Sequence, residues 1–297
     1  MKIYLLNKSI FIYQQCLVNN IKVGPIYKDV RNPLLLLFRR LHMKLHMPFY
    51  NIWYSREFLE DCQHGNEDVL FFDSVLSVYP ANYIKETTNR RVIYWFWNHV
   101  YNEWIVENLS NNIEKWSYDK DDCDKYNMRF NTQFGFLSLC SLQKTKVECT
   151  KDLFFIGKDK GRSSTLQELN DIASKQNLSC DFRITGNRVK GKNEAKRMSY
   201  EEVIREDSCT NCIVDIVPEE QHGLSLRPIE AIMLDKKLIT NNKHIINEPW
   251  YRESNVLLIN DHVENMQLAE FIHADYDSSI DHYKEYYDIN NWIKRFN

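Results

Sequence analysis

The segment 219–230, EEQHGLSLRPIE, joins an apolar run that ends at Pro218 to a helical pattern, and it carries side chains suited to binding an anion. Backbone N–H groups at the start of a helix point outward and attract phosphate. Gly223 lets the backbone approach an anion closely, and Arg227 offers a fork of donors that matches phosphate oxygens. Glu230 can accept hydrogen bonds from ribose hydroxyls. These residues predict a phosphate-binding turn, against the alternative of an ordinary strand-to-helix turn with a surface arginine and glutamate.

A second turn of this kind follows the apolar run 153–156 and reads GKDKGR, and a helical pattern begins directly after it. Two such turns in one half of the chain, each with glycine and cations, predict a single polyanion held between two helix starts. Neither turn has the spacing of a Walker A loop or of GxGxxG, and the alternative here is a solvated basic turn. The residues of this turn that we expect to bind the anion are Gly157, Lys158, Lys160, Gly161 and Arg162.

The elements around these turns alternate short apolar runs with helical patterns, which is typical of a parallel sheet covered on both faces. We expect strands at 153–156, 180–185, 212–217, 237–240 and 255–259, and helices at 163–176, 199–206 and 225–234. In the first half, 69–72 and 92–97 read as buried parallel strands, followed by Asp73 and His99. Ligands of such sheets bind beyond the carboxyl ends of the strands, where both glycine turns lie. We place the domain boundary at 144–151.

The composition is that of a globular protein, with 297 residues, 43% of them apolar, and a net charge of -3. This length suits two domains of about 150 residues or one large domain, and the charge argues against a dedicated nucleic-acid-binding protein. We find no signal peptide and no apolar run of ~18 residues, so the eight cysteines are expected to be free thiols in a reducing cytoplasm. Cys209 and Cys212 form a lone CxxC, which we interpret as structural.

The strip 34–49, LLLLFRRLHMKLHMPF, is amphipathic at helical spacing. Its apolar face is formed by Leu34, Leu37, Phe38, Leu41 and Leu45, and the basic residues largely avoid that face. Such a helix either lies on a membrane surface or packs its apolar face into the core with a basic side outward. We favour the core helix, and the membrane alternative stays open.

Several strings of the sequence resemble bacterial glycosyltransferases of the GT-B class that build lipopolysaccharide core and capsular polysaccharide. The strings are FFIGKDKGR, SYEEV, QHGLSLRPIEAI and KKLITNN in the second half, and YWFWNHV and EKWSYDKDDCDKYN in the first. The resemblance covers residues 70–260. It implies an α/β fold of two Rossmann-like domains facing across a cleft. The implied parts are an acceptor-binding domain at 1–147, a sugar-nucleotide-binding domain at 148–275, and a C-terminal helix at 276–297 that could pack back on the first domain.

The resemblance also implies roles for particular residues of the two turns. Lys160 and Gly161 match a Lys-Gly pair that meets the donor diphosphate in many members of this class. Gly223 and Glu230 match a glycine-rich turn and a glutamate that hold phosphate and ribose. The common pattern has two glutamates separated by seven residues, whereas here Glu220 stands before Gly223 and Glu230 falls two residues late. Further donor-binding candidates are Tyr200, near the base or the ribose, and Gln221, His222, Leu224 and Ser225.

The implied reaction moves a sugar from a nucleotide-sugar donor to a saccharide or lipid-linked saccharide acceptor. It would take place in the cytoplasm, and under the membrane alternative for 34–49 the protein would also contact the inner face of the cytoplasmic membrane through that strip. Lys160, Arg162 and Arg227 would neutralise the leaving diphosphate, so we expect no metal and no further cofactor. The competing hypotheses are a sugar-nucleotide-binding protein without catalysis and a GT-B-like sugar-nucleotide epimerase.

The base that would deprotonate the acceptor is expected at the end of a strand in the first half. Asp73 and His99 both satisfy this, and we prefer Asp73 narrowly because His99 lies among aromatic residues that favour a packing role. The run of carboxylates at 119–122 is interpreted as a solvated acidic turn and not as a metal site. If neither candidate is the base, the next are Asp119, Asp122 and Glu103.

Overall fold

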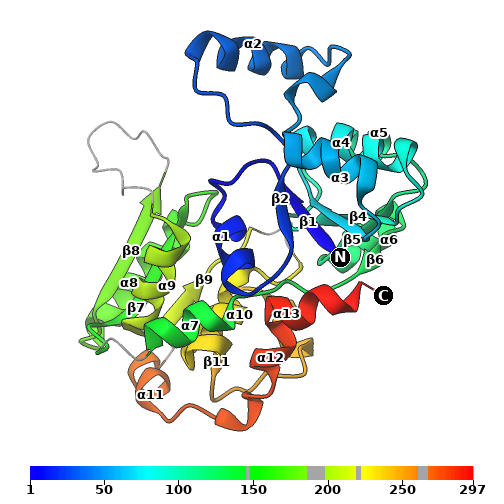
Figure 1. The fold of residues 1–297 in the computed structure, drawn as a ribbon. Coiled ribbons are helices and arrows are strands. Elements are labelled where there is room, and N and C mark those ends of the chain that lie inside the picture. Colours follow the sequence, from blue (N-terminus) through cyan, green and yellow to red (C-terminus); the bar gives the residue numbers. More distant parts are fainter. Residues whose placement is uncertain (145–147, 186–197, 219–221, 260–266, 297) are drawn as a thin grey trace. The chain divides into compact units, whose positions relative to one another are not determined.

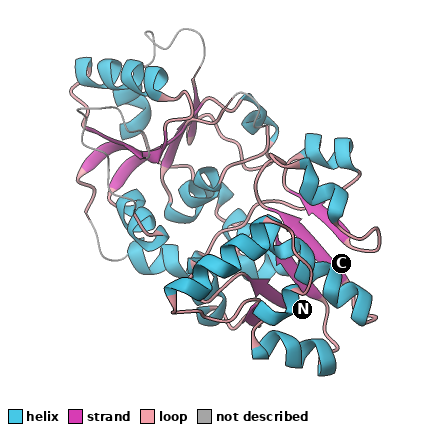
Figure 2. Ribbon diagram, turned by 90° about the horizontal axis from the view of Figure 1, so that it is seen from above, coloured by secondary structure: helices cyan, strands magenta, loops and turns pink. Residues whose placement is uncertain are grey.

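The computed structural model describes residues 1–144, 148–185, 198–218, 222–259 and 267–296. The chain forms two compact units, Met1–Asn131 and Thr132–Asn297, each built around its own parallel sheet (Figure 1). Strands and helices alternate in both units, and helices flank the strands of each sheet (Figure 2). The predicted α/β fold with two Rossmann-like domains is therefore confirmed.

The sheet of the first unit has the strand order β2-β1-β3-β4-β5-β6, with every neighbouring pair parallel. Its strands are β1 (Lys2–Leu5), β2 (Val23–Pro25), β3 (Val69–Phe72), β4 (Val92–Phe96), β5 (Glu114–Ser117) and β6 (Arg129–Phe130). β3 and β4 are the runs predicted as buried strands, and all their residues are buried, as expected for a covered parallel sheet. From β1 the chain crosses to β2 on one side and from β3 to β4 on the other, so the order reverses between β1 and β3.

The helices of the first unit are α1 (Phe11–Val18), α2 (Pro33–Lys44), α3 (Arg56–His64), α4 (Val75–Thr87), α5 (Glu103–Asn108) and α6 (Lys120–Tyr126), with the 3₁₀ helix η1 (Tyr50–Trp53) after α2. Among them, α2, α3, α4 and α6 begin at side-chain caps. Ser55 Oγ accepts from Phe58 N–H at 3.0 Å, and Ser74 Oγ accepts from Leu76 N–H at 3.2 Å. These bonds satisfy backbone donors that a helix start otherwise leaves unpaired, so they fix where α3 and α4 begin.

The interpretation of 34–49 as a core helix is wrong. The strip does form a helix, α2, but its apolar face is exposed, with Leu34 at 76% and Leu37 at 54% of full exposure. Only His42 and Met43 of α2 are buried. A helical pattern alone cannot show which element opposes the apolar face, and here none of the described elements buries it. None of the helices in the described ranges is long and apolar enough to cross a membrane.

The sheet of the second unit has the order β11-β10-β9-β7-β8 and is parallel throughout. Its strands are β7 (Lys151–Lys158), β8 (Cys180–Thr185), β9 (Thr210–Asp215), β10 (Lys237–Thr240) and β11 (Val256–Leu258). The helices are α7 (Leu137–Lys144), α8 (Ser163–Lys175), α9 (Tyr200–Ser208), α10 (Leu226–Leu234), α11 (Leu268–His273), α12 (Tyr283–Tyr287) and α13 (Ile289–Trp292). Each predicted strand and helix of this half corresponds to one of these, with bounds that differ by a few residues.

The compact units divide at Asn131 and Thr132, before the sequence-based boundary at 147/148. Residues that follow Asn131 are tied to the C-terminal segment, because Leu137 N–H donates to Asp288 Oδ1 at 3.0 Å and Trp292 Nε1 donates to Thr132 O at 2.7 Å. α7 and α12 both pack on α10. Both segments therefore belong with the second unit.

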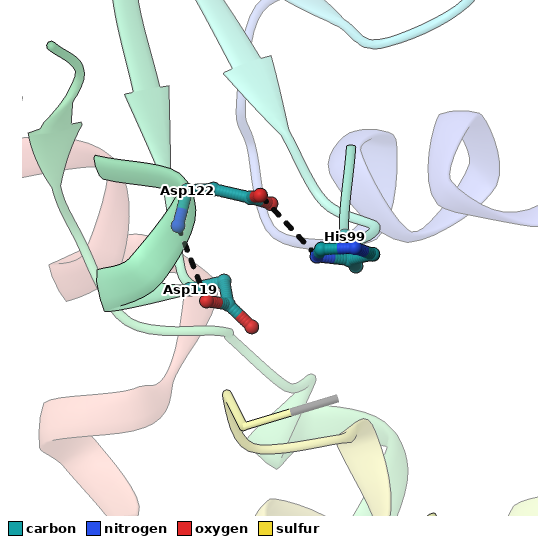
Figure 3. A group of neighbouring side chains, drawn as sticks. All are labelled: His99, Asp119 and Asp122. Carbon is teal, nitrogen blue, oxygen red and sulfur yellow. Dashed lines mark hydrogen bonds and ion pairs between the residues drawn. The ribbon is translucent and has the colours of Figure 1, made fainter. Parts of the chain in front are cut away.

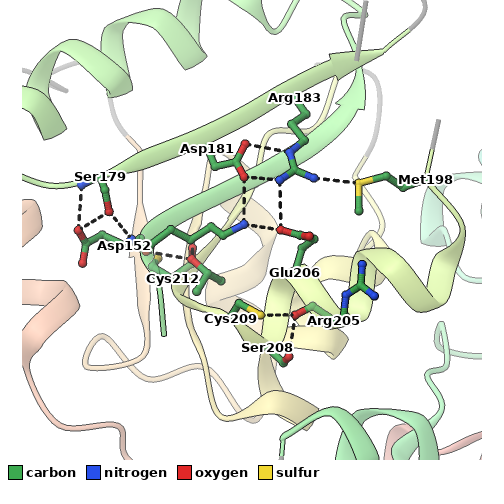
Figure 4. Close-up of polar contacts among 12 residues, drawn as sticks. Asp152, Ser179, Asp181, Arg183, Met198, Arg205, Glu206, Ser208, Cys209 and Cys212 are labelled. Carbon is green, nitrogen blue, oxygen red and sulfur yellow. Dashed lines mark hydrogen bonds and ion pairs between the residues drawn. The ribbon is translucent and has the colours of Figure 1, made fainter. Parts of the chain in front are cut away.

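An ionic network ties β7, β8 and α9 together (Figure 4). Arg183 Nη2 donates to Asp181 Oδ2 at 2.6 Å and to Glu206 Oε2 at 3.2 Å. Lys151 Nζ donates to Asp181 Oδ2 at 2.9 Å and also pairs with Glu206. Lys151 and Asp181 lie near the amino ends of their strands, away from the glycine turns, so this network is structural. Cys209 and Cys212 are free thiols, and Cys212 lies in the core.

Candidate functional site

The two glycine turns of the second unit meet at one point of the sheet. β7 and β9 are neighbours, and the chain leaves β7 for β8 on one side and β9 for β10 on the other. This is the position at which the strand order reverses, and open parallel sheets bind ligands in the crevice beyond the carboxyl ends at such a position. The turn 159–162 follows β7 and the segment 216–225 follows β9, so the prediction that both turns serve one ligand is consistent with the topology.

Two guanidinium groups converge over the end of β7. A Cβ atom at Gly157 would lie 3.0 Å from Arg162 Nη1 and 3.5 Å from Arg227 Nη2. Both groups also lie over the ring of Phe155, with Cζ 5.7 Å from the centroid for Arg162 and 5.0 Å for Arg227. A Cβ at position 157 would therefore press on Arg162, whose guanidinium would have to shift by a few tenths of an ångström, whereas its contact with Arg227 would be an ordinary one. The structure brings together Gly157, Arg162 and Arg227, which the sequence analysis had assigned to one anion site.

The charge of this pair is incompletely balanced. Arg162 Nε is buried without a hydrogen-bond partner among the residues that the structure describes. Burial, and then the nearby charge of Arg227, lower the pKa of Arg162. The two cations repel each other, and one of them has a buried N–H donor without an acceptor. An anion bound here would therefore stabilise the site. A diphosphate supplies both the negative charge and the acceptor oxygens.

Asp215 supplies the internal counter-charge, and the sequence analysis missed it. It ends β9, is fully buried, and its Oδ1 lies 3.7 Å from Arg227 Nη1. Ser225 Oγ donates to Asp215 Oδ1 at 2.9 Å and accepts from Arg227 N–H at 3.2 Å, which caps α10. Burial raises the pKa of Asp215, while Arg227 and Ser225 act against that rise. The available signal was an aspartate inside the apolar run IVDIV, where a carboxylate needs a partner.

Ser225 therefore positions the site in this structure and does not present its hydroxyl outward. The guanidinium of Arg227 is also fixed in place. Its Nη2 donates to the carbonyl of Ile156, and its Nη1 faces Asp215. Its guanidinium keeps further donors for a ligand, since arginine has five.

The end of β7 and the turn after it each present a lysine to solvent. Lys158 and Lys160 are exposed, and Lys160 and Gly161 have φ of 44° and 82°, so the backbone turns sharply here. Asp159 Oδ1 accepts from Ser163 Oγ at 2.7 Å and from Ser163 N–H at 3.1 Å, which holds the start of α8. Both lysine side chains are thus available to an anion at the end of β7.

The turn after β9 is held by two asparagines that follow β10. Asn242 Nδ2 donates to the carbonyls of His222 and Gly223, each at 3.4 Å, and the ring of His222 lies 4.8 Å from that of His244. Asn241 makes two bonds with the backbone of Val217. Leu224 is buried. The predicted donor residue Gln221 lies outside the described residues, and so does Glu220.

Glu230 and Tyr200 lie together inside the second unit. They share a hydrogen bond, and Glu230 is only 3% exposed. Burial raises the pKa of Glu230, and Asp207 is a further buried carboxyl nearby. In this arrangement the carboxyl of Glu230 faces Tyr200 and not solvent. Its role toward ribose, and that of Tyr200, stay predictions.

Asp73, in the first unit, follows β3 in an apolar setting. It is 8% exposed, and its Oδ1 accepts from Trp97 N–H at 3.0 Å. Burial raises the pKa of Asp73 to about 7, although hydrogen bonds from Trp97 and Asn98 act in the opposite direction. It lines a cavity of about 60 Å³, together with apolar residues such as Ile12 and Phe72. Sites for small molecules have volumes of about 300–1,000 Å³, so this space has room for water but not for a saccharide.

His99 is paired with a buried carboxylate (Figure 3). Its Nδ1 lies 3.2 Å from Asp122 Oδ1, and the side chain of His99 is 43% exposed whereas that of Asp122 is 2% exposed. Asp122 Oδ2 also accepts from Val100 N–H at 2.8 Å. When Nδ1 carries the proton toward Asp122, Nε2 has a free lone pair and can accept a proton. His99 therefore faces Asp122 at ion-pair distance, and Nε2 is the ring nitrogen that remains for other partners.

The interpretation of 119–122 as a solvated acidic turn is wrong, because Asp119 and Asp122 are 1% and 2% exposed. Asp119 Oδ1 caps α6 by accepting from Asp121 N–H at 3.0 Å and from Asp122 N–H at 3.4 Å. One ligand atom from each of His99, Asp119 and Asp122 lies within 4.8 Å of the others, so this group could also hold a cation. It is the only such group among the residues described.

A larger cavity lies beyond the carboxyl ends of β1 and β2. Its volume is about 710 Å³, within the range that small-molecule sites occupy. Leu36, Arg39 and Met43 of α2 form part of its wall. Its charged lining residues are Lys8, Lys28, Asp29, Arg39 and Glu57. The cavity can therefore accommodate a polar ligand with apolar parts.

Comparisons with known proteins were informative at the level of structure. No protein-family model matches the sequence, and no curated protein matches it. Among solved structures, the chain is similar to sucrose-phosphate synthase from Thermosynechococcus elongatus, with a TM-score of 0.57, 10% identity, and coverage of 96% of this chain and 90% of that one. It is similar to the T4 phage β-glucosyltransferase, with a TM-score of 0.55, 13% identity, and coverage of 100% and 98%. It is also similar to the Anabaena protein HepE, solved in complex with UDP and glucose, with a TM-score of 0.51, 8% identity, and coverage of 99% and 89%.

These likenesses extend over nearly the whole chain and over both units. At such low sequence identity they concern the fold alone, and the alignments cover both parallel-sheet units. The chain has the two-domain, Rossmann-like fold of GT-B glycosyltransferases.

Proposed function

We propose that this protein is a glycosyltransferase that uses a nucleoside-diphosphate sugar, UDP-linked in the first instance, as its donor. The observation that carries the proposal is the pair Arg162 and Arg227 over Gly157, with the partnerless buried Nε of Arg162, at the reversal point of the second sheet. The similarity to proteins whose names state glucosyl transfer, or a complex with UDP and glucose, supports this choice of donor.

In the proposed reaction the bond between the anomeric carbon and the diphosphate breaks, and a bond to the acceptor oxygen forms. Negative charge grows on the diphosphate as it leaves. Arg162, Arg227 and the exposed Lys160 would stabilise that charge, in a geometry already in place before the reaction. This chain's own cations would thus supply what a metal ion supplies elsewhere, so the proposed mechanism needs none.

His99 is the proposed base, with Asp122 as the residue that positions it. The acceptor hydroxyl would pass its proton to Nε2 of His99, and the buried carboxylate of Asp122 would stabilise the imidazolium that forms. Asp73 has a pKa suited to the same task, but the cavity that it lines has no room for a saccharide. We therefore place His99 ahead of Asp73, in reverse of the preference drawn from the sequence.

The acceptor would bind in the first unit, in the cavity of about 710 Å³ beyond β1 and β2. β3 lies between β1 and β4, so the cavity and His99 are about 10 Å apart along the sheet edge, at ~4.8 Å per strand. An extended saccharide spans such a distance. We propose a saccharide or lipid-linked saccharide of surface polysaccharide synthesis as the acceptor, and action in the cytoplasm at the inner face of the membrane.

An assay of nucleoside diphosphate release tests the proposal and separates it from its competitors. The full chain is incubated with a panel of nucleotide sugars, with and without a panel of lipopolysaccharide and capsule saccharides. A transferase releases diphosphate faster when a suitable acceptor is present. A sensor binds the donor and never releases diphosphate with acceptor. An epimerase converts the donor sugar without any acceptor, and either of these results would replace the proposal.

A further inference from the structure

The outward face of α2 is an unusually large exposed apolar surface. The side chains of Leu34, Leu37, Phe38 and Leu41, with that of the C-cap residue Leu45, are 76%, 54%, 51%, 48% and 65% exposed, and we call these five residues the α2 ridge. More than half of the large hydrophobic side chains that the described residues expose lie between positions 34 and 52. Figure 1 shows α2 in blue, standing clear of α3, α4 and α5 of the same unit. Contiguous apolar patches of this kind mark sites of interaction.

The ridge is held outward by the opposite side of the helix. His42 is 4% exposed; its Nδ1 accepts from Trp53 Nε1 at 2.8 Å, and its Nε2 contacts the carbonyl of Pro48 at 2.8 Å. Met43 is buried in the same core, and Asn32 caps the start of α2. The helix is thus fastened along its inner side and cannot rotate the ridge into the core.

Charge next to the ridge is of one sign. The sequence contains no aspartate or glutamate between Asp29 and Glu57, although the whole chain has a net charge of -3. Arg40 and Lys44 are exposed and lie one turn apart on the same flank of the ridge, at about 100° per residue around the helix. An apolar face bordered by cations complements a surface that is apolar inside and anionic outside.

We infer that the α2 ridge binds the surface of an anionic lipid bilayer, with α2 lying in the plane of the interface. Its 12 residues are too few to span a bilayer, which needs about 20. A second copy of this chain is a poorer occupant, because a symmetric contact through the ridge would bring two basic flanks together. Leucine and phenylalanine enter the acyl boundary in this arrangement, and Arg40 and Lys44 meet lipid phosphates.

This inference adds a membrane-binding surface to the proposed function. It rests on the proposed function only for the reason why the protein would bind a membrane. The inner side of α2 contributes Leu36, Arg39 and Met43 to the wall of the large cavity. A bilayer beneath the ridge would therefore lie one helix away from the proposed acceptor site, where a lipid-linked saccharide could enter it. The binding itself depends on α2 alone and not on the donor site.

Co-sedimentation of the full chain with vesicles tests the inference. We expect binding to vesicles of phosphatidylcholine containing about a third phosphatidylglycerol, weak binding to phosphatidylcholine alone, and loss of the difference at high salt. Leu37→Asp with Leu41→Asp should lower the partition coefficient by more than about tenfold. The matched control is Leu17→Asp with Val18→Asp, which places the same charges on the exposed, apolar end of α1 and should change binding little.

A second pair of variants isolates the charge. Arg40→Ala with Lys44→Ala should weaken binding to anionic vesicles about fivefold per residue and leave binding to neutral vesicles unchanged. The control is Arg56→Ala with Lys175→Ala, which removes the same amount of charge from exposed positions outside α2. It should weaken binding to anionic vesicles less than Arg40→Ala with Lys44→Ala, because only the net charge of the protein changes. All these side chains are exposed, and circular dichroism verifies that the variants fold.

The inference would be overturned if the Leu37→Asp with Leu41→Asp variant bound anionic vesicles as strongly as the Leu17→Asp with Val18→Asp control. A dimer in sedimentation velocity that Leu37→Asp with Leu41→Asp dissolves, without vesicle binding by the parent chain, would assign the ridge to a second copy instead. UDP affinity is measured on the same variants. Loss of vesicle binding with UDP affinity intact supports the inference, and failure of UDP to bind would count against the proposed donor site and leave the vesicle result standing.

Discussion

Replacing Arg162 by alanine should change stability and ligand affinity in opposite directions. In the unliganded protein the substitution removes a buried donor without a partner and relieves repulsion from Arg227. The remaining described contacts of its side chain are weak: a hydrogen bond from Nη1 to Lys158 O that is long at 3.4 Å, and the position of the guanidinium 5.7 Å from the centroid of Phe155. The free energy of unfolding should therefore stay the same or rise, by up to about 1 kcal/mol.

Affinity for the diphosphate should fall in the same variant. A hydrogen bond to a charged group contributes about 1.5–3 kcal/mol, which corresponds to a loss of roughly 10- to 150-fold in Kd. Isothermal titration with UDP measures the affinity, and urea unfolding without ligand measures the stability. This combination is typical of a residue that is strained until its ligand arrives.

Arg183→Ala is the matched control. Arg183 belongs to the same unit, but its guanidinium is held by Asp181 and Glu206 in the structural network (Figure 4). Its removal leaves two carboxylates less well paired, so stability should fall while UDP affinity stays unchanged. If Arg162→Ala instead destabilises the protein and leaves UDP affinity intact, Arg162 is a structural residue and the proposed phosphate site is wrong.

Four further outcomes are expected. Gly157→Ala should weaken UDP binding without any loss of charge, because the new Cβ would meet Arg162 Nη1 at 3.0 Å; unchanged affinity would show that the arginines have room to move. Asp73 has a folded pKa of about 7 against ~3.9 unfolded, so the folded state favours the protonated form and stability is lost as pH rises from 4 to 7. Asp73→Asn should remove this dependence of the free energy of unfolding on pH, which amounts to at most about 4 kcal/mol at ~1.36 kcal/mol per pH unit. Urea unfolding at pH 5 and pH 8 measures it, and the same change in stability between the two pH values in the parent chain and the variant would contradict the assignment. His99→Gln should lower turnover by about 10²–10⁴ and leave UDP affinity unchanged, whereas full activity would exclude it as the base. A chelator should not alter turnover; a loss restored by Mg²⁺ or Mn²⁺ would contradict the metal-independent mechanism and make His99, Asp119 and Asp122 the first candidate ligands.

The sequence predicted the second unit well because its signals are local. The strand 237–240 and the helix around Leu166, Leu169 and Ile172 follow from apolar runs and helical spacing, which adjacent residues determine. The grouping of the two glycine turns followed from a rule about parallel sheets, and the topology agrees with it.

Burial of individual side chains could not be predicted in the same way. The α2 ridge has the pattern of a core helix, and only the absence of an opposing described element leaves it exposed. Asp119 and Asp122 look like surface residues in sequence, yet a helix cap and the pair with His99 hold them inside. The convergence of Arg162 and Arg227 over Gly157 depends on side-chain directions that spacing does not specify.

Isothermal titration of UDP, a UDP-sugar and uridine against the parent chain and the variant Arg162→Ala with Arg227→Ala tests the central claim most directly. Asp215→Asn is added to the double variant in a second preparation, because Arg227 balances that buried carboxylate and its removal could otherwise unfold the protein. The account predicts that UDP and the UDP-sugar bind the parent chain, that uridine binds far more weakly because it lacks the diphosphate, and that both arginine variants lose UDP binding while remaining folded. Equal UDP affinity in the parent and the folded variants, or no nucleotide binding by the parent chain, would contradict it.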